Sequence, residues 1–471
     1  MDRLHPAELA GRRVLILGLG SFGGGTGACR ALHGFGAELR VTDLRPAAAL
    51  ADALDALADL ELDFVLGEHR EEDFAWAEVV VVNPAVPAGS PWLARAEALG
   101  SRLTTEVNLA IALRPELPTV AITGTHGKST CAAICAHLLG GLPGRTVLGG
   151  NLGGSLLEQV QELGDGDRLV VEMSSFQCER LVAPAGWPTV AILTSFGADH
   201  LDRHGDLATY GACKRRLLEA QTSTQTVLLP PPTKDAVQEA EVAAWQREAH
   251  GTVHRLRLDE AQRAGLEAED LPFTESYRLP SLLAALHAAR LLGMEDEPLR
   301  ARTRSFPGLP HRMARFTRED GRVVLDNGVA THPSPTAAAL RHLEGPVLLL
   351  AGGKDKGLPL AEVLGTLRAG HRLYLHGEGG RRLAEEAAAT AGPATELRHF
   401  PRAEEAFRAA LDEQRPHETL LFSPTFSSYD EFRNFSDRAR LFLSLGRFLH
   451  VEEGEGTASP ATRDDVTAAD S

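Results

Sequence analysis

Residues 119–130 read Thr119-Val120-Ala121-Ile122-Thr123-Gly124-Thr125-His126-Gly127-Lys128-Ser129-Thr130, and the helix-forming run Cys131-Ala132-Ala133-Ile134 follows them. An apolar, β-branched run that breaks into glycines ahead of a helical segment predicts a strand, a phosphate-binding loop and a helix. The N–H groups of such a loop turn toward an anion, and the helix start adds partial positive charge. Lys128 can neutralise a phosphate, and the hydroxyl of Ser129 or Thr130 can hold Mg²⁺. The stretch therefore predicts a nucleoside triphosphate site formed by Gly124, Thr125, His126, Gly127, Lys128, Ser129 and Thr130.

The match to the general phosphate-loop pattern is incomplete. That pattern has a glycine five residues before its Gly-Lys pair, and this chain has Ile122 at that position. A glycine-rich turn without a ligand is the alternative interpretation. The run Gly127-Lys128-Ser129-Thr130 at a strand-to-helix junction favours the phosphate loop.

The bulk composition narrows the class of protein. A chain of 471 residues is too long for one hydrophobic core and suggests about three domains. The formal charge of −16 argues against general nucleic-acid binding, which needs a net basic face. The apolar runs are too short to cross a bilayer, so we expect no membrane insertion. Five cysteines with no CxxC pair argue against a disulfide framework and favour the cytoplasm, and we expect Cys131 and Cys135 to be core residues.

The chain divides into four predicted regions. Strand signals at residues 13–17, 39–43 and 79–82 indicate a parallel α/β domain over residues 1–106. A second domain over residues 107–308 holds the phosphate loop and buried-strand runs at 169–172 and 190–194, and a third α/β domain spans 309–450. The acidic tail, residues 451–471, has few large apolar side chains and is predicted to be disordered. Residues 221–277 are weakly patterned, so no strands are assigned to them.

A second glycine motif lies in the first domain. Gly18-x-Gly20-x-x-Gly23, followed by Asp43 at a strand end, is typical of a dinucleotide site in which the carboxylate binds a ribose hydroxyl. A dehydrogenase is therefore one hypothesis. The same geometry suits any nucleotide diphosphate, however, and a simple dehydrogenase does not need a separate triphosphate loop.

Five segments together resemble the Mur ligases, ATP-dependent amide-forming enzymes of peptidoglycan precursor synthesis, and most of all the members that add D-glutamate. These segments are residues 124–130, 172–177, 199–203, 306–312 and 423–435. The resemblance covers residues 13–449 and implies three domains that bind, in order, a uridine nucleotide, ATP and the incoming amino acid. The implied fold is a Rossmann-like domain, a P-loop ATPase-like parallel sheet and a second Rossmann-like domain.

The resemblance implies that D-glutamate is added to UDP-N-acetylmuramoyl-L-alanine through an acyl phosphate. A carboxylate resists an amine because its oxygen is a poor leaving group, so ATP must phosphorylate it first. Lys128 and Mg²⁺ are needed because the carboxylate and the triphosphate bring negative charges together. The catalytic residues implied are Lys128, Glu172, His200 and Lys214.

Two Mg²⁺ ions are expected from the resemblance. Ser129, Thr130 and Glu172 offer oxygen ligands for one ion. His200 and Lys214, the latter carbamylated by carbon dioxide, would serve the second, because carbamylation turns a repelling ammonium into an anionic ligand. From the residues alone, Lys214 in a basic run is equally well an ordinary surface lysine.

The resemblance also implies substrate contacts. Gly20, Thr42 and Asp43 would lie near the uridine diphosphate, and Asn151, Ser174 and Gln177 near the muramoyl part. Arg312 would touch the ATP nucleotide. The residues expected around the glutamate carboxylates are Thr331, Lys356, Ser428 and Phe435. We expect a monomer whose partners are these three small molecules.

Several positions depart from the D-glutamate-adding pattern. His126 stands where Asn is common, as in L-alanine-adding relatives, and Ala198 replaces an acid. The usual Asp-Ser-Lys-Ala-Thr-Asn segment reads Asn327-Gly328-Val329-Ala330-Thr331-His332. A non-catalytic or re-specified paralogue that binds UDP-sugar or ATP, and an L-alanine ligase, therefore stay open as alternatives. We favour the active D-glutamate ligase, because the charges for phosphoryl transfer are present and the lost hydrogen bonds are worth about 1 kcal/mol each.

Overall fold

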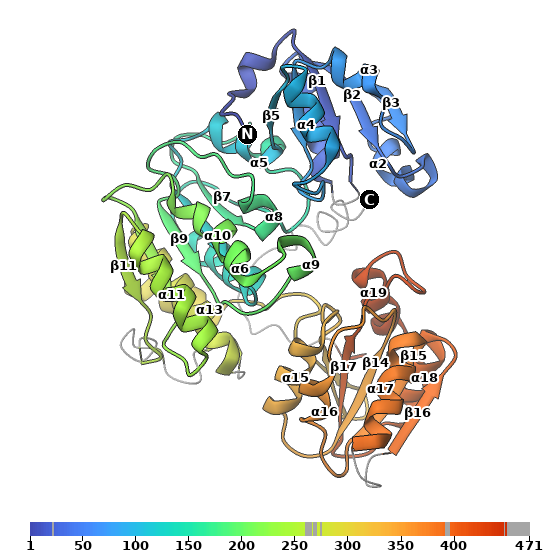
Figure 1. Ribbon diagram of the computed structural model, residues 1–471. Coiled ribbons are helices and arrows are strands. Elements are labelled where there is room, and N and C mark those ends of the chain that lie inside the picture. The colour runs from blue at the N-terminus through green and yellow to red at the C-terminus, as the bar shows by residue number, and fades with distance from the viewer. Residues whose placement is uncertain are drawn as a thin grey trace. The chain divides into compact units, whose positions relative to one another are not determined.

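The computed structural model describes residues 1–20, 23–259, 266, 271–273, 276–390, 396–446 and 448–449 (Figure 1). The predicted disordered tail, residues 451–471, lies outside this part of the chain. The chain forms two compact units, the first ending at Phe306 and the second beginning at Pro307 and including Tyr277. Strands alternate with helices along the chain and form three sheets, which confirms the predicted α/β class.

The first sheet is parallel and has the order β3-β2-β1-β4-β5. Its strands are β1 (Arg13–Leu17), β2 (Glu38–Asp43), β3 (Asp63–Leu66), β4 (Val79–Val82) and β5 (Arg102–Thr104). The helices of this region are η1 (Pro6–Leu9), α1 (Gly24–Gly34), η2 (Ala47–Leu50), α2 (Ala51–Asp55), α3 (Glu71–Trp76), α4 (Pro91–Ala98) and α5 (Glu106–Leu113). Leu17 pairs with Thr42 and with Val82, so the residues after β1, β2 and β4 meet at one edge.

The second sheet is also parallel and has the order β11-β10-β9-β6-β8-β7. Its strands are β6 (Thr119–Thr123), β7 (Thr146–Gly150), β8 (Arg168–Glu172), β9 (Val190–Leu193), β10 (Thr226–Leu229) and β11 (Thr252–Arg255). The helices are α6 (Lys128–Leu139), α7 (Leu156–Val160), α8 (Ser175–Cys178), α9 (Leu201–His204), α10 (Leu207–Arg215), η3 (Arg216–Leu218), α11 (Ala236–Glu248), η5 (Ser276–Arg278), α13 (Leu279–Leu291) and α14 (Asp296–Arg304). Within the described part of the weakly patterned stretch, residues 221–277, lie β10, α11, β11 and the start of η5. Cys131 and Cys135 are fully buried in α6, as predicted.

One hydrophobic core joins the first two sheets. Val14 and Ile16 of β1 belong to the same buried cluster as Ala121 of β6, and Leu109 and Ile111 of α5 are part of it. The predicted boundary at residue 106 therefore lies inside the first compact unit.

The third sheet forms the second unit and has the order β16-β15-β14-β17-β13-β12-β18. Its strands are β12 (Ala314–Arg318), β13 (Val323–Asp326), β14 (Val347–Gly352), β15 (Arg372–His376), β16 (Glu396–Phe400), β17 (Thr419–Thr425) and β18 (Phe448–Leu449). The helices are α15 (Pro333–His342), α16 (Ala361–Leu364), α17 (Gly377–Thr390), α18 (Ala403–Glu413) and α19 (Phe435–Leu445). β12 runs antiparallel to both neighbours, and the inner strands are parallel.

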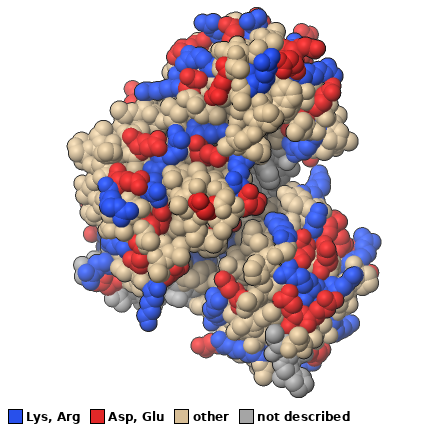
Figure 2. Space-filling view, viewed as in Figure 1, with Lys and Arg blue, Asp and Glu red and all other residues tan. Residues whose placement is uncertain are grey.

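The surface carries both signs of charge. Figure 2 shows basic and acidic side chains interspersed over the face in view, on a chain whose formal charge is −16. Within the described residues, the helices fall short of the length and apolar character that a bilayer crossing needs.

Candidate active site

The loop between β6 and α6 has a backbone that only glycine adopts easily. Gly124 has a φ of 148° and Gly127, which caps α6, has a φ of 82°. A Cβ atom on Gly124 would lie 2.1 Å from Thr194 Oγ1, and one on Gly127 would lie 2.8 Å from Ser281 Oγ. The close approach of these side chains fixes the turn at the start of α6, where backbone N–H groups and the helix dipole suit a phosphate.

Two lysines reach the carbonyl groups of this turn. Lys128 Nζ donates to Gly124 O at 3.0 Å and to Thr125 O at 2.9 Å. Lys214 Nζ donates to the same Gly124 O at 2.9 Å. Lys128 brings positive charge to the turn, as a triphosphate site needs, and Lys214 places a second amine at the same carbonyl oxygen.

Lys214 is not a surface lysine, so that alternative is wrong. Its side chain is 1% exposed, and its Nζ lies 4.4 Å from the centre of the Tyr210 ring. Burial, and then the positive charge of Lys128, lower the pKa of Lys214 from 10.5 to about 7. A large fraction of the amine is therefore neutral near physiological pH.

Glu172 ends the strand beside the loop. In the register of β6 and β8 it pairs with Ile122, two positions before Gly124. Its Oε1 accepts from Asn151 Nδ2 at 2.8 Å, whereas its buried Oε2 has no hydrogen-bond donor among the described residues. A buried carboxylate oxygen without a donor fits a cation, so the site is compatible with Mg²⁺.

Hydroxyl groups that the sequence analysis missed complete the turn. Thr194 Oγ1 donates to His126 O at 2.6 Å, and His126 N donates to Ser195 Oγ at 2.8 Å. Ser281 Oγ donates to Gly127 O at 3.3 Å. Thr194 and Ser195 directly follow β9, which pairs with β6, so their position after a predicted strand was the available signal.

The other expected metal ligands occupy two places. Ser129 and Thr130 lie in the first turn of α6, directly after Lys128. His200 precedes α9 in a left-handed conformation with a φ of 51°, and its half-exposed ring lies 5.0 Å from that of Phe176. Its Nε2 lies 3.6 Å from Asp199 Oδ2. Metal binding by these three residues stays a prediction.

The first glycine turn is organised by a carboxylate. Asp43 Oδ2 accepts from the N–H of Leu19 at 2.9 Å and of Gly20 at 3.3 Å, and Asp43 Oδ1 accepts from Arg45 N at 2.9 Å. Burial opposes ionisation of Asp43, but Arg45 and the N–H of Gly20 outweigh it and lower the pKa. Thr42 Oγ1 lies 2.7 Å from His69 Nδ1. Nucleotide contacts by Gly20, Thr42 and Asp43 stay predictions.

Ser174 and Gln177 form a capping box. Ser174 Oγ accepts from Gln177 N at 3.2 Å, and Gln177 Oε1 accepts from Ser174 N at 3.0 Å. These bonds start α8 directly after the strand that ends in Glu172. Substrate contacts by Ser174, Gln177 and Asn151 stay predictions.

In the second unit, the loop after β14 and the segment after β17 lie together. Lys354 N donates to Ser427 O at 2.8 Å, which places the exposed Lys356 and the buried Ser428 on neighbouring segments. Phe435 begins α19 and is exposed.

Further predicted residues lie on the segments after β13 and before β12. Thr331 is half-buried ahead of α15, and Arg312 is half-buried next to His311. His311 Nδ1 lies 2.6 Å from the buried Asp326 Oδ2. The structure thus gives these residues positions, and their ligand contacts stay predictions.

Comparison with known proteins adds independent information. A family model described as the Mur ligase middle domain matches residues 122–276, and one described as the Mur ligase glutamate ligase domain matches residues 311–426. The UDP-N-acetylmuramoylalanine–D-glutamate ligase of Geobacter metallireducens is 36% identical, with 95% of this chain and 99% of that protein covered. The protein of the same name from Roseiflexus sp. is 34% identical over 93% of this chain and 99% of its own length.

A solved structure shows the same fold. MurF from Acinetobacter baumannii superposes with a TM-score of 0.54 at 14% identity, covering 94% of this chain and 92% of that one. The likeness extends over both compact units. Together with the matched domains and the nearly full-length relatives, these findings show that the chain belongs to the Mur ligase family.

Proposed function

We propose that this chain is an ATP-dependent ligase that joins D-glutamate to UDP-N-acetylmuramoyl-L-alanine in peptidoglycan precursor synthesis. Relatives that carry this activity in their names align with nearly the whole chain. The observation that carries the proposal is the convergence of Lys128 and Lys214 on Gly124 O, at 3.0 and 2.9 Å. Lys128 supplies the positive charge that phosphoryl transfer between anions requires, and Lys214 lies beside it as a candidate metal ligand.

The chemistry begins with an unreactive carboxylate. The phosphate loop and Lys128 hold the triphosphate, with Lys128 exchanging the carbonyls of Gly124 and Thr125 for phosphate oxygens. A carboxylate oxygen of the alanyl group then takes the γ-phosphoryl group, and ADP leaves. The amine of D-glutamate attacks the acyl carbon, its C–N bond forms as the C–O bond to phosphate breaks, and the amine loses a proton. The products are ADP, phosphate and the amide.

The chain offers two sets of ligands for Mg²⁺. Ser129, Thr130 and Glu172 would hold one ion, and His200 and carbamylated Lys214 a second. Bound there, the ions would spread the negative charge of the transferring phosphoryl group. The orphaned Oε2 of Glu172 supports the first assignment, because a buried carboxylate oxygen without a donor favours a cation.

The lowered pKa of Lys214 supports carbamylation. A pKa of about 7 leaves a neutral amine whose nitrogen can attack carbon dioxide. The new N–C bond gives a carbamate, and one proton is released. Because Lys214 lies beside Gly124 O, the carbamate would offer an anionic oxygen ligand to Mg²⁺ at the phosphate loop, where an ammonium group would repel the ion.

The remaining residues would hold the two other substrates. Gly20, Thr42 and Asp43 would bind the uridine diphosphate, and Asn151, Ser174 and Gln177 the muramoyl part. In the second unit, Arg312 would contact the ATP nucleotide. The proposed D-glutamate residues are Thr331, Lys356, Ser428 and Phe435.

Phosphate release from ATP tests this function. We expect release when UDP-N-acetylmuramoyl-L-alanine, D-glutamate and Mg²⁺ are all present, and loss of release when any one is left out. Release only with UDP-N-acetylmuramate and L-alanine would show that the amino-acid assignment is wrong. Tight ATP binding without release, under every combination, would favour the non-catalytic paralogue.

A further inference from the structure

Three side chains with metal-binding atoms meet outside the phosphate loop. They are Glu179, which directly follows α8, His204, which ends α9, and Cys213 of α10. One donor atom of each, an oxygen, a nitrogen and a sulfur, lies within 4.8 Å of the others. Successive residues of this set are 25 and 9 positions apart in the sequence, so the fold brings together metal-binding side chains that no short sequence motif predicts.

We propose that Glu179, His204 and Cys213 form a binding site for one divalent cation of the Zn²⁺ class. The distance between His204 Nδ1 and Cys213 Sγ is 3.7 Å. Bonds of about 2.0 Å to nitrogen and about 2.3 Å to sulfur, meeting at a tetrahedral angle, place such atoms roughly 3.5 Å apart. A small rotation of the side chains therefore closes the site around an ion.

The other atoms of these side chains already have partners that orient them. His204 Nε2 lies 3.0 Å from Ser175 Oγ, which leaves Nδ1 facing the sulfur. Arg203 Nη2 lies 2.7 Å from Glu179 Oε2 and holds the carboxylate whose oxygen joins the cluster. Hydrogen bonds of this kind behind the ligands fix their orientation in metal sites.

The donor set selects the class of cation. Thiolate and imidazole suit Zn²⁺ and its neighbours, whereas Mg²⁺ prefers oxygen ligands. Binding replaces the thiol proton of Cys213 by the ion, with one proton released to solvent, and the carboxylate and thiolate balance the charge of the dication. Arg203 and Arg216 lie near Cys213 and oppose the ion, so we expect weaker binding than at a structural zinc site.

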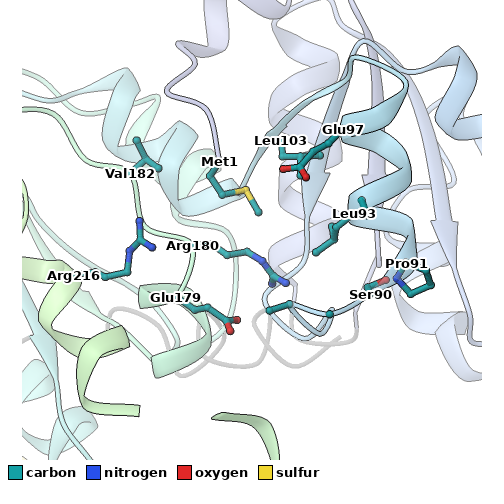
Figure 3. Close-up of a pocket in the computed structure, with 13 residues that line it drawn as sticks. Met1, Ser90, Pro91, Leu93, Glu97, Leu103, Glu179, Arg180, Val182 and Arg216 are labelled. Atoms are coloured by element: carbon teal, nitrogen blue, oxygen red, sulfur yellow. The ribbon is translucent and has the colours of Figure 1, made fainter. Parts of the chain in front are cut away.

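One ligand of the site lines a cavity. Glu179 borders a cavity of about 420 Å³ together with Arg180, Arg216 and residues of the first sheet's region, such as Ser90 and Glu97 (Figure 3). His204 and Cys213 are buried and do not line this cavity. Glu179 therefore belongs both to the cavity wall and to the cluster of donor atoms.

Cobalt spectroscopy on the full chain tests the proposal. We expect Co²⁺, added to chelator-treated protein, to give a thiolate-to-Co²⁺ charge-transfer band that saturates at one equivalent. Zn²⁺ should displace the ion, and excess Mg²⁺ should not. Glu179→Gln should weaken Co²⁺ binding by roughly 10- to 100-fold, because a ligand is lost.

Cysteine variants decide which thiol binds. Cys213→Ala should remove the band, and the isosteric Cys213→Ser should do the same if the alanine variant folds poorly. Cys178→Ala is the matched control, because Cys178 is a buried neighbour of Glu179 outside the cluster, and it should keep the band. The absence of a band in the unmodified protein, or its persistence in both Cys213 variants, would overturn the proposal.

Discussion

The first unit contains two strand–glycine–helix turns whose electrostatics are opposite. In the turn after β1, the N–H groups of Leu19 and Gly20 point at the Asp43 carboxylate. In the turn after β6, the carbonyl of Gly124 accepts from Lys128 and Lys214. The same backbone motif thus meets a carboxylate in one place and two lysine amines in the other.

This difference shows why a glycine motif alone does not identify a ligand. At the first turn a protein carboxylate already occupies two N–H donors, which leaves less positive potential for a polyphosphate. At the second turn the lysine side chains bind the carbonyl groups, and the N–H groups at the start of α6 suit an anion. The side chains that bond to each turn, rather than the glycines within it, distinguish the kind of ligand that each turn can bind.

Removing Lys128 tests the cationic turn most severely. Lys128→Ala should lower the rate of phosphate release by about 1,000-fold or more, since a charge that stabilises a transferring phosphoryl group is lost. The variant should still bind UDP-N-acetylmuramoyl-L-alanine, measured by calorimetry, because that ligand is assigned to the other turn. Turnover near the unmodified rate would show that the phosphate loop is misassigned.

The second lysine separates catalysis from stability. Lys214→Met should lower phosphate release by about 100-fold, comparable to losing one electrostatic contact to a transition state. The same change should stabilise the fold, because a buried ammonium is removed. Both rates and denaturant midpoints can be measured on the same preparations.

The pH dependence of this stabilisation has a definite sign. The pKa of Lys214 is about 7 in the folded chain against an ordinary 10.5, so between these values the unfolded chain binds more protons. The free energy of unfolding of the unmodified chain therefore rises with pH across this range. The gain from Lys214→Met should be largest at pH 7 and below, roughly 1–3 kcal/mol, and shrink toward pH 10. An equal gain at pH 6 and pH 10, in carbonate-free buffer, would contradict the lowered pKa.

Asp43 tests the turn with the carboxylate. Asp43→Asn removes the charge that holds the N–H groups of Leu19 and Gly20, and the resulting loosening should raise KM for the UDP-linked substrate by about tenfold. KM for ATP should change little, because ATP is assigned to the other turn. Asp59→Asn is a suitable control, since Asp59 is exposed and paired with Arg30. Equal effects on both KM values would remove the division between the turns.

The sequence predicted the inner strands better than the outer ones. β6, β8 and β9 are buried throughout, so their apolar runs are continuous and easily recognised. β12 lies between β13 and the two-residue strand β18, is only partly buried, and carries polar residues on either side of Phe316, so no strand was predicted there. β10 and β11 were missed too, because they lie in a polar stretch that also holds α11.

The residues of the candidate site also differ in how well the sequence predicts their positions. The phosphate-loop residues and Glu172 follow from their places at strand ends. The burial of Lys214 could not be predicted from the sequence. Its neighbour Arg215 makes the segment resemble a solvated basic run, although Arg215 forms an ion pair with Glu241. The hydroxyls of Thr194 and Ser195 depend on the register of β9 against β6, which no local pattern reveals.

The smallest effect is expected at His126, the phosphate-loop position where the family resemblance leads us to expect Asn. His126 is fixed in the turn through its backbone, since its N–H donates to Ser195 Oγ and its carbonyl accepts from Thr194 Oγ1 and Ser195 Oγ. His126→Asn keeps these bonds and should change phosphate release by less than about threefold. Ser195→Ala removes two of the bonds and should cost about five- to tenfold. A larger loss from His126→Asn than from Ser195→Ala would mean that the imidazole itself contacts the nucleotide. The phosphate loop would then depend on the His126 side chain as well as on the two lysines that distinguish it from the first turn.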